Sequence, residues 1–541
     1  MNDGNENKRQ GTISSARLNL LSSMVGGGCL SLPLAFHQTG NIFVGPIILV
    51  VTALFAQQSI LFLIKAGVYS TTSRGNDEAN NAESRRNDIL GNRKGVASYE
   101  NVASCAFGPK ARLCAMALVC ICCYFAAVGY AVLLRDMLEP IVDAIVTPAE
   151  GVGGGPTFAR NAAMLLIVLC TSPLTTWRNL TALKDVGAAS MVAVLTVGLC
   201  VAYRSIECQM GVGENNSSKS EDVDGSMRAF PPSIKELLDA LPLFVSSYVC
   251  HFNVLPIHNE LKCPSSDRVK HWVRTTIWPA TLFYYVIGLS GSMFAKCTAS
   301  GSVQGNILLD FDEDDPLLLL GRLCLAMTIT LAFPMVVIPP RDIIVRSLRG
   351  SSIGMREHQS ALNTTTNDNA DLNELTIVDF EPIDMNNTGN TLEEPLLVLE
   401  HQSVSTMSMA GESDEFDENN LQTSSTQLRE GDADSKVLRS IVALLVFWSA
   451  AGVACSVKSI DVVWDLVGSS FSIVLAFLIP CGAYLKLSRR RRFAEVQGGR
   501  FGYRKWMVSR SVAWVVIFIF APLMVISTLN ACYNRFLSKS N

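Results

Sequence analysis

Charged side chains are scarce in this chain of 541 residues. Asp, Glu, Lys and Arg together make up 17% of the sequence and 49% is hydrophobic, whereas soluble proteins carry about 25% charged residues. The sequence also lacks a nucleophile–base pair, a glycine-rich phosphate loop and the spacing of metal ligands. We therefore expect an integral membrane protein that is not an enzyme and holds no cofactor.

The net charge of −4 averages two unlike parts of the chain. Residues 351–436 contain 18 acidic and 3 basic side chains, a composition typical of a disordered acidic loop. The rest of the chain is therefore basic, as expected for a membrane protein with Lys and Arg at its cytosolic edges. No nucleic-acid partner is implied, and we expect any regulatory protein to bind the acidic loop.

Runs of about 20 apolar residues predict transmembrane helices. Lys and Arg are densest at 486–505; their distribution places the N-terminus inside, and an odd number of spans places the C-terminus outside. No signal-peptide cleavage site is evident, so we expect an uncleaved first span. Eleven spans are predicted, at 14–37, 43–68, 112–138, 161–178, 186–206, 237–257, 272–296, 316–340, 438–458, 462–486 and 508–530.

Polar segments separate these spans into two groups. The outside loop contains two overlapping N-glycosylation acceptors, Asn215 and Asn216, so we expect a glycoprotein. The predicted organisation is a cytosolic tail at 1–13, spans one to eight at 14–350, the disordered acidic cytosolic loop at 351–436 and spans nine to eleven at 437–541, with a cytosolic polar loop at 71–97 and the outside loop at 207–236.

The first span weakens its own helix. Three consecutive glycines, Gly26, Gly27 and Gly28, are followed by Pro33, and glycine costs a helix about 1 kcal/mol and proline about 3 kcal/mol. Non-helical backbone at membrane depth occurs only where it faces protein or a water-filled cavity. A discontinuous spanning helix therefore indicates a substrate or ion site near the midplane.

The sixth span shows a corresponding pattern of polar residues and prolines. Five plus five inverted repeats would pair it with the first span. Half-helix ends offer amides for a carboxylate and carbonyls for an ammonium group or Na⁺, which together describe a site for a zwitterion. The polar and proline positions of this span are Pro242, Ser246, Ser247, His251, Asn253 and Pro256.

Several stretches resemble the amino acid/auxin permease superfamily, closest to the branch of sodium-coupled neutral amino acid transporters. They are NLLSSMVGGGCLSLPLAFHQTG at Asn19, YENVASCAFGPKARL at Tyr99, WRNLTALKDVG at Trp177, FVSSYVCHFNVLPIHNELKCPS at Phe244, GNILLDFDEDDPLLLLGRL at Gly305 and FPMVVIPPRD at Phe333, with a weaker match at Val463. The resemblance covers all spans. It implies an all-α membrane protein with a leucine-transporter-like fold, in which a ten-helix inverted repeat carries an eleventh helix.

The resemblance further implies a secondary active transporter, a symporter of small neutral amino acids that works by alternating access. An amino-acid sensor that binds but transports little is the alternative. The plasma membrane and the vacuolar or lysosomal membrane are both expected locations. The implied substrate-binding residues are Ser22, Ser23, Gly26, Gly27, Gly28, Ser246, Ser247, Tyr248, His251 and Asn253.

The coupling ion stays open between Na⁺ and H⁺. In sodium-coupled relatives an Asn of the first span and a Ser or Thr of the eighth ligate Na⁺. Here Ser22 stands at the aligned position of that Asn. His251 is the histidine deep in a span, either a proton-coupling group or a neutral side chain hydrogen-bonded in the bundle. Residues that would ligate Na⁺ are Asn19, Ser22, Thr328 and Thr330.

Two cysteines close neighbouring spans on the outside. Cys208 ends span five and Cys297 ends span seven, and oxidising conditions there permit a disulfide. Related transporters resemble this arrangement. We therefore expect a Cys208–Cys297 bridge.

Overall fold

The computed structural model describes most of the chain. Within the described residues the chain folds into helices, with one isolated backbone bridge between Gly11 and Leu261. The described ranges are 11–80, 97–145, 156–176, 184–211, 227–298, 300–312, 315–368, 418–457, 460, 463–464, 467–490 and 499–533.

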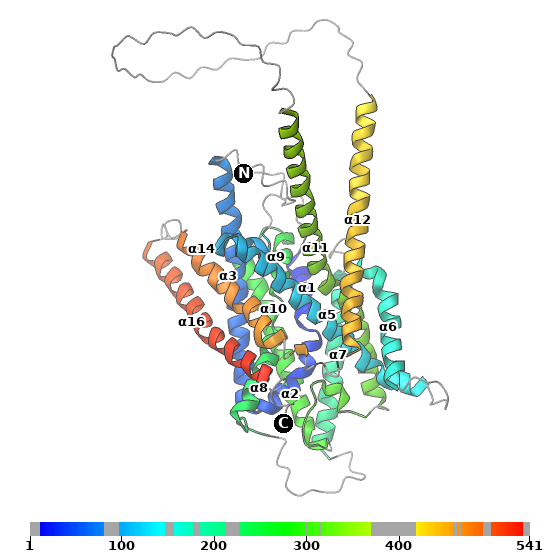
Figure 1. Ribbon diagram of the computed structural model, residues 1–541. Coiled ribbons are helices and arrows are strands. Elements are labelled where there is room, and N and C mark those ends of the chain that lie inside the picture. Colours follow the sequence, from blue (N-terminus) through cyan, green and yellow to red (C-terminus); the bar gives the residue numbers. More distant parts are fainter. Residues whose placement is uncertain are drawn as a thin grey trace, which may run out of the picture. The chain divides into compact units, whose positions relative to one another are not determined.

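The helices that cross the predicted membrane are shown in Figure 1. Among the residues that the structure describes, ten helices are long and apolar enough to span a bilayer, and the bent helix pair at the N-terminus, counted as one span, brings the number to eleven. The elements are α1 (Ile13–Met24), η2 (Gly27–Ser31), α2 (Leu32–Thr39), α3 (Val44–Asn80), α4 (Tyr99–Phe107), α5 (Pro109–Ile145), α6 (Pro156–Thr175), α7 (Lys184–Gln209), α8 (Ile234–Ser247), α9 (His251–Glu260), α10 (Ser266–Met293), η5 (Phe294–Cys297), η6 (Ile307–Leu309), α11 (Pro316–Asp368), α12 (Glu418–Ala454), η8 (Val467–Phe471), η9 (Val474–Leu478), α14 (Ile479–Arg490) and α16 (Gly499–Cys532).

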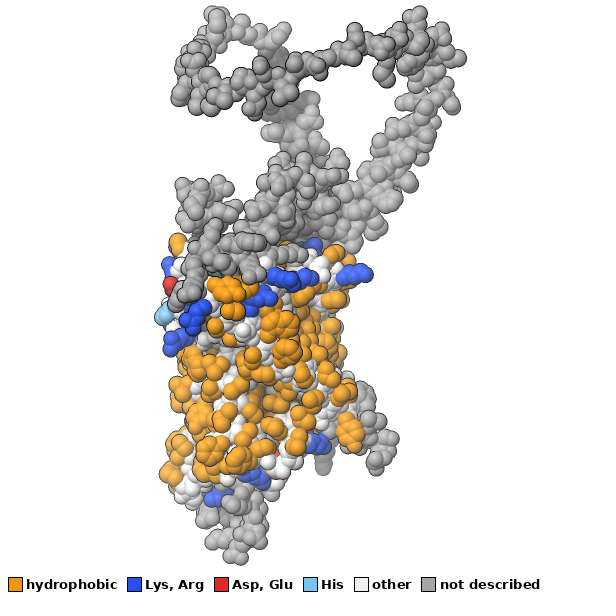
Figure 2. Space-filling view, turned by 90° about the vertical axis from the view of Figure 1, so that its left-hand side faces the viewer, with side chains coloured by type: hydrophobic (Ala, Val, Ile, Leu, Met, Phe, Trp, Pro, Cys, Tyr) orange, Lys and Arg blue, Asp and Glu red, His pale blue; other side chains and the backbone are white. Residues whose placement is uncertain are grey.

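The surface of this helical unit suits a bilayer. Figure 2 shows a broad hydrophobic face with Lys and Arg side chains at both of its ends. The exposed large side chains include Leu166 on α6, Leu199 on α7 and Phe518 on α16. Apolar side chains facing outward are stable only against lipid or another protein. The chain is a multi-pass membrane protein, as predicted.

The first span is broken where the glycines predict. Helix α1 ends at Met24, and the two halves of the span meet at an angle of 50°. Five residues of 3₁₀ helix, η2, lead into α2, where Pro33 occupies the first turn and loses no helical hydrogen bond. Helix α2 packs closely on α10, because a Cβ on Gly291 would lie 2.5 Å from the Pro33 ring.

The sixth span is broken as well. Helix α8 ends at Ser247 and α9 begins at His251, so Tyr248, Val249 and Cys250 join the two halves. The half-helices of spans one and six pair with each other, α2 with α8 and α1 with α9. Two interruptions distant in sequence therefore lie beside each other in the fold.

Helices extend further into the polar loops than predicted. Helix α3 continues to Asn80 within the expected 71–97 loop, α11 runs to Asp368 and α12 begins at Glu418 within the expected disordered loop at 351–436. No proline occurs from 341 to 381 or from 418 to 436, so proline does not end α11 or α12 within these ranges. The remainder of the loop, 369–417, lies outside the described residues.

The chain divides into two compact units. One comprises Met1–Ser347 and Leu438–Asn541, and contains the two broken spans and their neighbours. The other comprises Leu348–Val437 and contains the distal part of α11 and the first part of α12. All features of the candidate site belong to the first unit.

The tenth span has an unusual start. It begins with two π-helical segments, η8 and η9, before the regular helix α14. Gly468 allows η8 to lie against α8, because a Cβ there would be 2.5 Å from the carbonyl oxygen of Pro242. π-Helical turns occur frequently at functional sites, and this one faces the break of the sixth span.

Candidate functional site

A cavity of about 50 Å³ lies between the two breaks. A water molecule needs about 10–15 Å³ of such space, and a cavity of about 150 Å³ holds benzene, so this one has room for a few waters or a small ligand. Among the described residues that line it, none is charged. The lining residues are Ser22, Ser23, Met24, Gly26, Gly28, Cys122, Ala126, Tyr130, Ser246, Val249, Phe252, Asn253, Ala332, Val336, Trp464, Val467 and Ser472.

Three serines of the broken spans present oxygen lone pairs to this cavity. The Ser22 hydroxyl donates to the carbonyl of Asn19 at 3.2 Å, and the Ser23 hydroxyl donates to that of Leu20 at 3.0 Å. Ser246 donates to its own helix in the same way, at 2.9 Å. A hydroxyl has one proton and two lone pairs, so Ser23 and Ser246 keep acceptor capacity at their oxygens. Acceptors without charge suit an ammonium group.

The glycine run lies against the third span. A Cβ on Gly26 would be 2.7 Å from the Tyr130 hydroxyl oxygen, whereas a Cβ on Gly28 would meet nothing closer than Ser247 Cα at 3.7 Å. Gly26 therefore permits a close approach that a larger residue would prevent. Gly27 occupies the first position of η2, between the two.

Three other predicted residues lie behind the cavity wall. Ser247 donates to the carbonyl of Leu243 at 2.9 Å, and the Tyr248 hydroxyl pairs with Thr281 Oγ1 on α10 at 2.9 Å. His251 is fully buried, and its ring lies 6.2 Å from the ring of Phe477. The hydrogen bonds of Ser247 and Tyr248 hold the sixth-span break, and none of the three side chains lines the cavity.

His251 has no hydrogen-bond partner for either ring nitrogen among the described residues. The expectation of a neutral histidine hydrogen-bonded within the bundle is therefore wrong for this conformation. A buried polar group without a partner is costly.

Tyr284 of α10 connects the two breaks directly. Its hydroxyl oxygen lies 2.9 Å from the carbonyl oxygen of Met24 and 2.8 Å from that of Ser247. These are the last residues of α1 and α8, whose carbonyls lack partners within their own helices; the Met24 carbonyl accepts from the Gly26 amide at 3.0 Å. The hydroxyl can donate its proton to either one. Nothing in the pattern around Tyr284 predicts this role, because it depends on how α10 packs against both spans.

The expected sodium ligands are not brought together at the cavity. Ser22 lines it, whereas Asn19, Thr328 and Thr330 do not. The Thr328 hydroxyl donates to the carbonyl of Cys324 at 2.9 Å, and Asn19 Oδ1 is buried without a partner in the described structure. The ligation of Na⁺ by these four residues stays a prediction.

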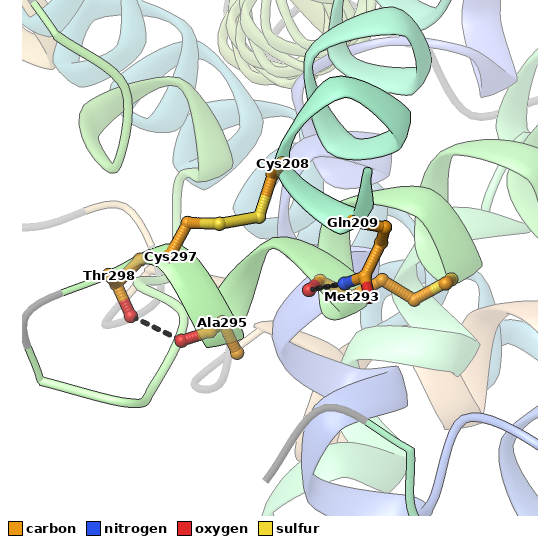
Figure 3. Close-up of a disulfide and its surroundings, with 6 residues drawn as sticks. All are labelled: Cys208, Gln209, Met293, Ala295, Cys297 and Thr298. Atoms are coloured by element: carbon orange, nitrogen blue, oxygen red, sulfur yellow. Dashed lines mark hydrogen bonds between the residues drawn. A yellow bond between two sulfur atoms is a disulfide. The ribbon is translucent and has the colours of Figure 1, made fainter. Parts of the chain in front are cut away.

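The outer end of the fold is cross-linked. Figure 3 shows the disulfide between Cys208 at the end of α7 and Cys297 in η5, with Cα atoms 6.3 Å apart, which the sequence predicts. Beside it, the Gln209 side-chain amide donates to the carbonyl of Met293 at 2.8 Å. Both contacts connect α7 with the end of α10.

The loop between α10 and α11 is held over the first span. Buried Arg322 of α11 donates to the carbonyls of Leu308 at 2.8 Å and Phe311 at 3.1 Å. The Ser31 hydroxyl donates to the carbonyl of Gly305 at 2.7 Å. Burial raises the pKa of Asp310 in the same loop, while the backbone N–H of Gln304 opposes this. The expected glycosylation acceptors, Asn215 and Asn216, lie outside the described residues.

Among the lining residues that the sequence analysis did not predict, three carry a hydroxyl or an indole N–H. Tyr130 comes from α5, and Trp464 and Ser472 come from the start of the tenth span. All three are polar side chains within apolar runs. That signal marks candidates, but it does not show which face of each helix turns toward the breaks.

Comparison with known proteins identifies the family. The family model described as "Transmembrane amino acid transporter protein" matches residues 9–532, so the chain belongs to this family of amino acid transporters and not to a family of enzymes. The similarity extends over nearly the whole chain, which accords with the superfamily resemblance seen in the sequence motifs.

Individual relatives are distant. "Vacuolar amino acid transporter 5" of Schizosaccharomyces pombe is 25% identical over 62% of this chain and 70% of its own. "Putative sodium-coupled neutral amino acid transporter 11" of Danio rerio is 22% identical over 64% and 68%. The crystal structure of MhsT in complex with L-phenylalanine aligns with a TM-score of 0.50 and 11% identity over 96% of this chain and 98% of MhsT. This likeness confirms the predicted leucine-transporter-like fold.

Proposed function

We propose that this member of the transmembrane amino acid transporter family moves small neutral amino acids as a secondary active transporter. The observation that carries the proposal is the uncharged cavity between the two helix breaks. A zwitterion needs hydrogen-bond acceptors for its ammonium group and hydrogen-bond donors for its carboxylate, a short distance apart. The two breaks supply both from backbone groups.

The substrate's α-amino and carboxylate groups would bind the breaks. Amides of the Gly26–Gly28 segment would hold the carboxylate, because they begin the η2 and α2 half of the span, where amides lack intrahelical partners. The Gly26 amide would first have to leave the Met24 carbonyl, to which it donates at 3.0 Å. The ammonium group would lie at the carbonyl end of α8 and near the hydroxyl oxygens of Ser22 and Ser246. Each charged group thus meets a helix end of opposite partial charge.

The polarity of the cavity supports a neutral substrate. An ionised substrate side chain would need a buried counter-charge, and none of the described lining residues supplies one.

Alternating access would follow from rocking about the two breaks. Because α1 pairs with α9 and α2 with α8, the inner halves can move together while the outer halves stay with the loop held by Arg322. The coupling ion would be Na⁺, bound by Asn19, Ser22, Thr328 and Thr330, or a proton carried by His251.

Uptake into proteoliposomes tests the function. The purified chain would be supplied with a panel of amino acids, with Na⁺ replaced by choline and at two pH values. We expect saturable uptake of small neutral amino acids that depends on one of the two gradients. Binding without uptake would instead support the sensor alternative.

The membrane and orientation are part of the proposal. A vacuolar, lysosomal or plasma membrane suits the named relatives. With the N-terminus in the cytosol, Asn215 and Asn216 face the glycosylating side and Asn363 does not. Glycan mapping by mass spectrometry should find sugar at the first pair, and sugar on Asn363 would invert the topology.

A further inference from the structure

The tenth span brings two hydrogen-bonding side chains to the cavity without pairing them. Trp464 is 8% exposed, Ser472 is fully buried, and both residues line the cavity. Neither the indole Nε1 nor the serine Oγ has a hydrogen-bond partner in the described part of the chain. Unpaired buried donors are costly, so their partner is expected to come from whatever occupies the cavity.

The lining residues divide into two groups by origin. Spans one and six contribute the helix breaks, which suit the amino and carboxylate groups common to all amino acids. Spans three, eight and ten contribute side chains without a helix break: small apolar ones such as Ala126, Ala332 and Val467, and the hydrogen-bonding ones of Tyr130, Trp464 and Ser472. With the amino and carboxylate groups at the breaks, the substrate's own side chain would face spans three, eight and ten.

Packing fixes the positions of the two unpaired residues. The Trp464 indole lies against α5, where a Cβ on Gly129 would be 3.4 Å from Cζ2 of the ring. Ser472 follows the π-helical segment η8, which Gly468 holds close to α8. Both side chains are thus anchored by close backbone approaches rather than by hydrogen bonds of their own.

We propose that Trp464 and Ser472 form a subsite for the substrate's side chain, which carries a neutral hydrogen-bond acceptor, either a hydroxyl or a carboxamide. The indole N–H only donates, whereas the serine hydroxyl donates or accepts. An aliphatic side chain would leave both groups unpaired, and sites built to hydrogen-bond a substrate discriminate strongly against analogues that lack the group. This inference rests on the proposed transport of neutral amino acids.

Matched substrate pairs test the subsite. Threonine and valine are nearly isosteric, as are asparagine and leucine, and only the first of each pair carries an acceptor. We expect wild-type proteoliposomes to favour threonine and asparagine by kcat/KM. The W464F and S472A variants should each lower that preference about 3- to 10-fold, mainly by slowing uptake of the acceptor-bearing substrate.

Two matched controls exist within the chain. Trp272 on α10 and Ser527 on α16 are also buried without a partner for their polar atoms, but they do not line the cavity. W272F and S527A should leave the substrate preference unchanged. Melting temperatures in detergent would show that all four variants fold.

The outcomes separate the subsite from the function itself. The subsite would be overturned, with transport left in place, if the wild type showed a kcat/KM ratio of threonine to valine near one. It would also be overturned if W464F and S472A lowered the kcat/KM of threonine and of valine equally. A wild-type protein that takes up no amino acid in either gradient would overturn the proposed function.

Discussion

Replacing Gly26 with alanine is the sharpest test of the broken first span. The added Cβ would lie 2.7 Å from the Tyr130 hydroxyl oxygen, where ordinary contact begins at 3.4 Å. Backbone strain does not contribute to the effect of this substitution, because Gly26 has a φ of −124°, which alanine also adopts. The overlap of about 0.7 Å must be relieved by moving the ring or the break.

The expected loss follows from the cost of overpacking. Inserting a methyl group into a filled site costs about 1–3 kcal/mol, which corresponds to roughly a 5- to 150-fold decrease in uptake if it falls on the transporting conformation. Tyr130 has little freedom to yield, since it is buried and its ring packs edge-on against Phe333 at 5.9 Å. Initial rates of radiolabelled uptake in proteoliposomes would measure the loss.

A second substitution makes the reasoning refutable. Removing the hydroxyl with Y130F leaves ring atoms at 3.4 and 3.5 Å from the new Cβ, so the G26A/Y130F double variant should regain the uptake of Y130F alone. G28A, whose Cβ would meet nothing within 3.7 Å, should lower the melting temperature in detergent less than G26A does. If the double variant is no better than G26A, contact with Tyr130 is not the cause.

Three further predictions concern the ends of the fold. Gly11 makes two backbone hydrogen bonds to the chain at the end of α9, at 2.9 and 3.0 Å, and a Cβ on Gly11 would lie 2.8 Å from the Glu260 carbonyl oxygen. G11A should therefore break these two hydrogen bonds and speed maleimide labelling of buried Cys250, measured by mass spectrometry. An unchanged labelling rate would show that the two hydrogen bonds do not hold α9. R322M should lower the melting temperature in detergent by several degrees, because two loop carbonyls lose a charged donor worth about 1.5–3 kcal/mol each, whereas R322K should lose less; equal losses would contradict this account. C208S and C297S should each destabilise by about 2–4 kcal/mol, with no further loss in the double variant, and reducing agent should bring the wild type to the same melting temperature.

The spans and their breaks could be predicted from the sequence for a physical reason. Lipid excludes unpaired backbone, so the length of each apolar run and the three glycines before Pro33 carry strong local signals. The extents of α3, α11 and α12 could not be predicted this way, because polar residues without proline permit a helix as readily as a loop. Composition alone does not decide between them.

The cavity's side chains were only partly predictable. Ser22, Ser23, Ser246 and Asn253 lie next to the breaks in sequence, so locating the breaks also located them. Trp464 reaches the cavity because its indole packs on Gly129, more than 300 residues earlier. Which side of a helix turns toward the cavity depends on tertiary packing, and no local periodicity of the sequence encodes it.

Tyr284 explains why the two breaks behave as one site. Its hydroxyl touches the last carbonyl of α1 and of α8, which lie 260 and 37 residues away in sequence, yet it has one proton to donate. At any moment one of the two carbonyls therefore lacks this donor, whereas the Met24 carbonyl also accepts from the Gly26 amide at 3.0 Å. Under the proposed function, the substrate's ammonium group would donate to both breaks at once. Such a ligand would favour the conformation in which spans one and six come together on α10, because only differential contact shifts a conformational equilibrium.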